Sequence, residues 1–141
     1  MKKLPGVLLV DDDPITNALN ERLLRKLNVA EEYLTACDGV EALAALQLLT
    51  ARASPASPAL VLLDITMPGL DGMGFLEAYQ QLPPLQQASA VIVLHTVSMT
   101  STDLGRVEGL PIAGLVSKPL TTGKIDIILQ VHYRRQLPSA D

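Results

Sequence analysis

Short apolar runs alternate with longer stretches in which apolar residues recur at helical spacing along most of the chain. Residues 7–10, 59–64 and 90–96 are rich in Val, Leu and Ile, which is typical of strands buried on both faces of a parallel sheet. Residues 32–37 predict a weaker strand, and residues 113–119 predict a fifth. The intervening stretches are long enough to hold helical crossovers.

The first helix is expected within residues 13–29. Pro14 occupies the favoured first-turn position, and Asp13 precedes it as a candidate N-terminal cap. Apolar residues follow at helical spacing, which predicts an apolar face packed on the sheet. The residues assigned to that face are Ile15, Leu19, Leu23 and Leu27.

Two further helices are expected in the next part of the chain. The stretch 38–53 begins at Asp38 with Glu41 three residues later, a spacing that favours a helix start. The stretch 72–82 predicts a helix that ends where Pro83 and Pro84 follow.

Residues 100–110 predict a poor helix with two glycines, and residues 123–137 predict the last helix. One side of the last helix carries Ile125, Ile128, Leu129 and His132. Five strands alternating with five helices indicate an α/β fold, in which right-handed crossovers cover both faces of an open, doubly wound parallel sheet. No repeat or linker divides the chain, so we expect a single domain over residues 1–141.

Composition narrows the classes of function. The net charge of −4 and the pI near 5.1 argue against nucleic-acid partners or an anionic membrane surface, and 3% aromatic content argues against base stacking. The lone Cys37 fits a reducing compartment. No signal peptide is visible and no apolar run approaches a membrane span, so we expect a cytoplasmic protein without membrane insertion.

Charged residues follow several strands directly. Asp11, Asp12 and Asp13 follow the first strand, Asp64 ends the third and Lys118 follows the fifth. In such sheets, ligands bind beyond the carboxyl ends of the strands. If the first and third strands are neighbours, these carboxylates converge, and their repulsion raises at least one pKa unless a cation lies among them.

This all-oxygen ligand set favours Mg²⁺ over zinc. An ammonium group at Lys118 could neutralise an incoming phosphoryl group, and Thr96 adds a hydroxyl donor at the same edge. Asp64 is then a candidate nucleophile that accepts a phosphoryl group as an acyl phosphate.

The segments "LLVDDDP", "LLDITMPGLDG", "VIVLHT" and "VSKPL", in this order and spacing, resemble the receiver domain of two-component response regulators. The resemblance covers about residues 5–133. It implies a flavodoxin-like fold with strand order 2-1-3-4-5, in which Asp64 is the phosphoacceptor.

The resemblance also implies roles for the other site residues. Asp11 and Asp12 form the acidic pair, and Mg²⁺ is bound by this pair, Asp64 and the backbone carbonyl of Thr66. Lys118 matches the phosphate-binding lysine, whose peptide bond to the following proline is usually cis in the family.

Two positions depart from the family pattern. The switch hydroxyl usually follows the apolar run of the fourth strand directly, where this chain has His95, whereas counting back from Lys118 points to Thr96. Thr96 is favoured because a hydroxyl donates without a protonation requirement, and His95 is the alternative. Leu115 stands where the family often has an aromatic residue, which argues against a readout by tyrosine rotation.

A receiver of this kind takes a phosphoryl group from a histidine kinase or a histidine phosphotransfer protein. It would switch binding of an unidentified downstream protein through the face formed by residues 100–110, the fifth strand and the last helix. We expect a stand-alone receiver without an output domain, monomeric or dimeric on phosphorylation. Its catalysis would be limited to its own phosphotransfer and autodephosphorylation.

Two alternatives remain. A phosphatase of the haloacid dehalogenase type also uses a strand-end Asp nucleophile with Mg²⁺, but it needs a second Asp at the position of Thr66 and the chain is short for a cap domain. A pseudo-receiver that binds partners without phosphorylation is the other alternative, although all the acids and the lysine are present.

Overall fold

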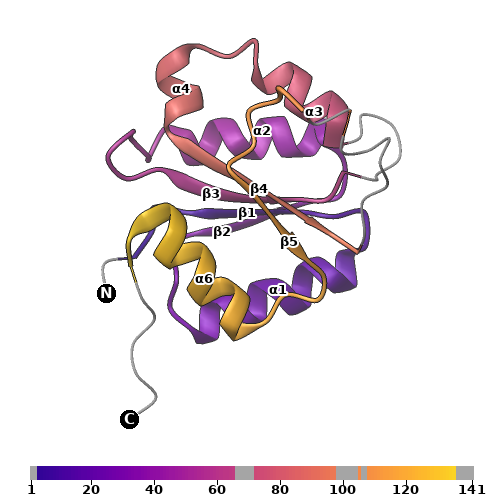
Figure 1. Ribbon diagram of the computed structural model, residues 1–141, viewed down its shortest axis with the longest axis vertical. Coiled ribbons are helices and arrows are strands. Elements are labelled where there is room, and N and C mark those ends of the chain that lie inside the picture. Colours follow the sequence, from indigo (N-terminus) through magenta and orange to yellow (C-terminus); the bar gives the residue numbers. More distant parts are fainter. Residues whose placement is uncertain (1–2, 66–71, 98–104, 106–107, 136–141) are drawn as a thin grey trace.

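A computed structural model of the protein describes residues 3–65, 72–97, 105 and 108–135. Five parallel strands form one sheet in the order β2-β1-β3-β4-β5 (Figure 1), which confirms the predicted fold class and strand order. The strands are β1 (Val7–Val10), β2 (Tyr33–Ala36), β3 (Ala59–Leu63), β4 (Ala90–Thr96) and β5 (Gly114–Ser117).

Helices cover both faces of the sheet (Figure 1): α2, α3 and α4 lie on one side, and α1 and α6 on the other. Their bounds are α1 (Pro14–Lys26), α2 (Gly39–Thr50), α3 (Gly72–Tyr79), α4 (Pro84–Ala88) and α6 (Thr122–Tyr133). Each face has its own apolar core, because alternate strand residues point to opposite sides. Within the described ranges, no helix combines the length and the apolar character needed to cross a bilayer.

The predicted helix starts are confirmed. The Asp13 side chain accepts a hydrogen bond from the Ile15 N–H, with Pro14 in the first turn. At α2, Asp38 accepts from the Glu41 N–H at 2.8 Å, and the Glu41 carboxylate accepts from the Cys37 N–H at 2.9 Å. These bonds satisfy amide groups that the helices themselves leave open.

The apolar face assigned to the first helix is wrong in part. Ile15 and Leu19 are 69% and 61% exposed, whereas Asn17 and Leu24 are the buried residues of α1. Asn17 turns inward because its side-chain amide donates to the backbone oxygens of Asp11 and Ala36, each at 3.1 Å. A polar residue therefore lies on the buried side of α1, to which the sequence pattern assigned only apolar residues.

The later helices differ from the sequence expectations at their ends. Pro84 begins the short helix α4 instead of only ending the previous helix, since proline fits the first turn of a helix. The helix α6 stops at Tyr133, where Arg134 adopts a left-handed backbone with φ 54°. Its buried side is Ile125, Ile128 and Leu129, as predicted, with His132 partly buried. The helix expected at 100–110 lies mostly outside the described residues.

Candidate functional site

Strand pairing brings the predicted acids to one edge of the sheet. Val10 of β1 pairs with Leu63 of β3, so the next residues of both strands, Asp11 and Asp64, are neighbours. The Asp64 N–H donates to the Val10 carbonyl at 2.9 Å, and the Asp11 N–H donates to the Ala36 carbonyl at 3.1 Å. Both acids are therefore held by continuations of the sheet's own hydrogen bonds.

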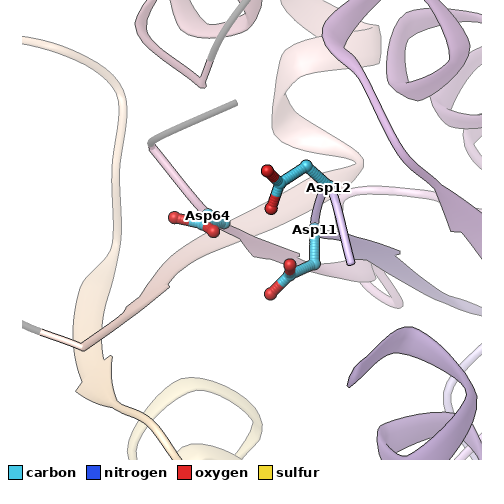
Figure 2. A group of neighbouring side chains, drawn as sticks. All are labelled: Asp11, Asp12 and Asp64. Carbon is cyan, nitrogen blue, oxygen red and sulfur yellow. The ribbon is translucent and has the colours of Figure 1, made fainter. Parts of the chain in front are cut away.

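The side chains of Asp11, Asp12 and Asp64 form what we call the acid cluster. One carboxylate oxygen of each lies within 4.8 Å of the other two, and Figure 2 shows the three groups gathered around one volume. Asp11 and Asp64 are 4% and 6% exposed, whereas Asp12 is open to solvent. Oxygen ligands that are fixed on one side and hydrated on the other suit Mg²⁺, which retains several of its waters.

The ammonium group of Lys118 lies against the acid cluster. Its Nζ is 2.5 Å from Asp11 Oδ2 and 3.1 Å from Asp64 Oδ2. The Lys118–Pro119 peptide bond is cis, as the family resemblance implied. The Lys118 N–H donates to the Thr96 carbonyl at 2.9 Å, which extends the pairing of β4 and β5 to the site.

Electrostatics at the site reflect an excess of negative charge. Loss of hydration, a hydrogen bond with Asp11 and the charges of Asp11 and Asp64 raise the pKa of Asp12, which matches the expected repulsion. Burial opposes the charge on Lys118, but its hydrogen bonds to Asp11 and Asp64 prevail and raise its pKa. Among the described residues, the Lys118 ammonium contacts two of the three clustered carboxylates, Asp11 and Asp64, an arrangement that favours an additional cation.

Two residues that support the site escaped the sequence analysis. Asn17 ties α1 to the end of β1 by donating to the Asp11 carbonyl. Lys124 of α6 donates from Nζ to the carbonyls of Ser117 and Pro119, at 2.8 and 2.9 Å, and so fixes the loop that carries Lys118. The sequence gives no signal of these supporting roles, because a single Asn in an amphipathic helix or a Lys in the first turn of a helix is common without any such role.

The two candidates for the switch position are adjacent and both buried. His95 pairs with Val116 across β4 and β5, and Thr96 pairs with Ser117. Burial, followed by the charge of Lys118, lowers the pKa of His95 to about 4. Thr66, expected to offer a backbone carbonyl to the metal, lies outside the described residues.

Comparisons with known proteins agree on one family. Residues 7–130 match the family described as the response regulator receiver domain. The two-component response regulator ARR22 of Arabidopsis thaliana is 29% identical over 124 residues, which is 88% of this chain and 80% of that protein.

Solved structures are similar over nearly the whole chain. A two-component response regulator from Cytophaga hutchinsonii has a TM-score of 0.77 at 27% identity, with 95% of this chain and 100% of that chain covered. The Vibrio cholerae chemotaxis protein CheY4 has a TM-score of 0.70 at 26% identity, covering 90% and 97%.

Proposed function

Because the chain belongs to the response regulator receiver domain family, we propose that Asp64 is the residue that accepts a phosphoryl group. The observation that carries the proposal is the position of its carboxylate. It is buried at the end of β3, within reach of Asp11 and Asp12 on one side and 3.1 Å from Lys118 Nζ on the other. A nucleophile and its charge-neutralising partners therefore meet in one place.

The proposed reaction is a transfer between two nucleophiles. A carboxylate oxygen of Asp64 attacks the phosphorus of a phosphohistidine, and a new P–O bond forms as the P–N bond breaks. The bonding electron pair of the P–N bond passes to the imidazole nitrogen of the donor. Lys118, which now contacts Asp11 and Asp64, would pair with an oxygen of the transferred group.

The acid cluster fits a divalent metal, and receiver domains in general bind Mg²⁺ through such acids. Asp11, Asp12 and Asp64 would hold Mg²⁺ in this chain, with the Thr66 carbonyl as a further ligand. When bound, Mg²⁺ neutralises charge on the phosphoryl oxygens. The two buried acids keep the cluster in place, and exposed Asp12 leaves one side open to a ligand.

Receiver domains exchange phosphoryl groups with histidine kinases or phosphotransfer proteins, and we propose such a donor for this chain. The partner that reads the signal would bind the face formed by β5 and α6 with the segment before β5. Exposed apolar side chains on that face support this assignment; they are Leu115, Ile127 and Val131.

The two alternatives are weaker than the phosphoacceptor role. A phosphatase of the haloacid dehalogenase type needs an acid at the position that Thr66 occupies. A pseudo-receiver has no need for three acids and a lysine within contact distance, whereas all four are in place here.

Intact-mass measurement tests the proposal. Incubation with acetyl phosphate and Mg²⁺ should add the mass of one phosphoryl group to the parent chain, and chelation of the metal should abolish the gain. Asp64→Asn should gain nothing, while Asp38→Asn, a matched change at the α2 cap, should be modified like the parent. An equal gain in Asp64→Asn would refute the assignment.

A further inference from the structure

Strand alternation places one residue of β4 on the same face as the buried acids. Leu62 and Val93 are paired and belong to the core beneath α1 and α6, so residues two positions later in each strand point to that face again. Those residues are Asp64 and His95. Leu94 belongs to the opposite core, beneath α2 and α3, and Thr96 follows it to that side.

The pairing register brings His95 next to Asp64. Leu63 of β3 pairs with Leu94 of β4, so the next residue of each strand stands beside the other. On its other side His95 pairs with Val116 of β5. Asp11, Asp64 and His95 thus form a row across three neighbouring strands on one face of the sheet, and this row leads toward Lys118.

The imidazole of His95 is buried and incompletely bonded. The residue is 4% exposed, and its Nε2 atom has no hydrogen-bond partner within the described part of the chain. The charges of Lys118, Asp11 and Asp64 all act on the ring, as does that of Lys124. Buried polar atoms without a partner are uncommon in folded proteins, and a functional site is one of the usual reasons.

We propose that His95, and not Thr96, is the switch residue, and that its Nε2–H donates a hydrogen bond to an oxygen of the phosphoryl group on Asp64. This inference rests on the proposed function of Asp64. A phosphoryl oxygen would supply the acceptor that the buried nitrogen lacks. The His95 ring would donate this hydrogen bond from the face of the sheet that bears Asp64. The Thr96 side chain would have to donate it from the opposite face.

The direct test uses the protein labelled with ¹⁵N in its histidine rings. Beryllofluoride, whose fluorines stand in for phosphoryl oxygens, is added with Mg²⁺. We expect the His95 Nε2–H signal to shift and to show coupling to fluorine. His132 is the internal reference, because its ring lies against Gly114 at the other end of β5. An unchanged His95 signal in a protein that has bound beryllofluoride would overturn the inference.

Affinity for beryllofluoride provides a second, independent readout. His95→Leu, which keeps an apolar group in the buried space, should bind at least about tenfold more weakly, because a hydrogen bond to a charged group is lost. His95→Gln, which can place an N–H in a similar position, should recover much of the affinity. Loss of affinity in Thr96→Val with none in His95→Leu would instead assign the role to the hydroxyl.

The outcome separates this inference from the proposed function. If the parent chain does not take up beryllofluoride and Asp64→Asn behaves identically, the phosphoacceptor role fails. If the parent binds and His95→Leu binds equally well, only the role of His95 fails. Melting of His95→Leu at or above the parent temperature in metal-free buffer would confirm that any loss of affinity is not a loss of fold.

Discussion

At the amino ends of the strands, the buried hydroxyl of Tyr33 completes its hydrogen bonds within the chain, whereas at the carboxyl ends the buried Nε2 atom of His95 has no partner in the described residues. The Tyr133 hydroxyl, at the end of α6, is the other buried side-chain atom without a partner in that part of the chain. The Tyr33 hydroxyl donates to the Leu24 carbonyl at 3.0 Å and accepts from the Ala30 N–H at 2.9 Å. Nearby, Leu4 bridges to Ala30 and is almost fully buried. The amino-end region therefore closes the core and leaves no buried hydrogen-bonding group of Tyr33 open to a ligand.

The carboxyl-end region holds most of the buried polar side chains in the described residues: Asp11, Asn17, Asp64, His95 and Thr96. In the described part of the chain, the Lys118 ammonium contacts two carboxylates, Asp11 and Asp64, and the His95 Nε2 lacks a hydrogen-bond partner. Groups arranged in this way do not optimise the stability of the free protein, and real proteins depart from local optima mainly at functional sites. The amino ends of the strands thus lie against a closed core, whereas the carboxyl ends present the polar groups on which the proposed function depends.

Removal of a core side chain at the amino end should give the largest loss of stability and leave phosphorylation of the folded protein unchanged. Leu4→Ala should lower the free energy of unfolding by about 2–5 kcal/mol, because it leaves a cavity in a packed core. Urea unfolding measures this change. The folded fraction should still gain one phosphoryl group from acetyl phosphate, and loss of modification in folded molecules would contradict the separation of the two regions.

Lowering the pH should destabilise the folded protein through protonation of His95 in the carboxyl-end region. The pKa of His95 is about 4 in the folded protein, against about 6.5 in an unfolded chain, so between these values the unfolded state binds more protons. The free energy of unfolding is therefore unaffected by this group above pH 6.5 and falls as the pH drops toward 4, by on the order of 3 kcal/mol.

Urea unfolding of the parent and His95→Leu in metal-free buffer between pH 4 and 7 measures this effect. The variant should lose less stability than the parent as the pH falls. All other groups are the same in the two proteins, so the difference between the two curves isolates His95. Parallel curves for the two proteins would show that the buried imidazole is not the group responsible.

Neutralising Asp12, the exposed acid of the cluster, should change the stability least, but the direction of the change should depend on Mg²⁺. The pKa of Asp12 is raised, so Asp12→Asn should stabilise the metal-free protein slightly, by less than about 1 kcal/mol given its exposure. With Mg²⁺ the parent should become the more stable of the two proteins, because it binds the ion more tightly in the folded state than Asp12→Asn does. Thermal melting with and without Mg²⁺ measures both.

The matched control for this prediction is Asp126→Asn on α6, outside the acid cluster. Its melting temperature should follow that of the parent in both buffers. A stabilisation by Mg²⁺ that is equal in Asp12→Asn and the parent would show that the ion binds elsewhere.

The sequence predicted the sheet well because β1 and β3 are buried along their whole length and so read as unbroken apolar runs. It also placed Asp11, Asp12, Asp64 and Lys118 at one edge, since strand ends in a parallel sheet share an edge. The inward turn of Asn17 could not be predicted, because it depends on carbonyls that only the folded sheet brings within reach.

The choice between His95 and Thr96 shows a second limit. Counting from the apolar run and counting from Lys118 give different answers, because loop length between strands is not fixed by sequence pattern. Only the pairing of Leu63 with Leu94 tells which of the two residues shares a face with Asp64. A shift of one residue moves a side chain to the opposite face of a sheet.

The central claim is that Asp64 carries the phosphoryl group, and reductive trapping tests it most directly. Borohydride cleaves an acyl phosphate and leaves homoserine where the modified aspartate stood. After reaction with acetyl phosphate and Mg²⁺, peptide mapping should find homoserine at position 64 and unmodified aspartate at 11 and 12. Homoserine at position 11 or 12 with intact Asp64, or no homoserine at all in a folded protein supplied with Mg²⁺, would contradict the account.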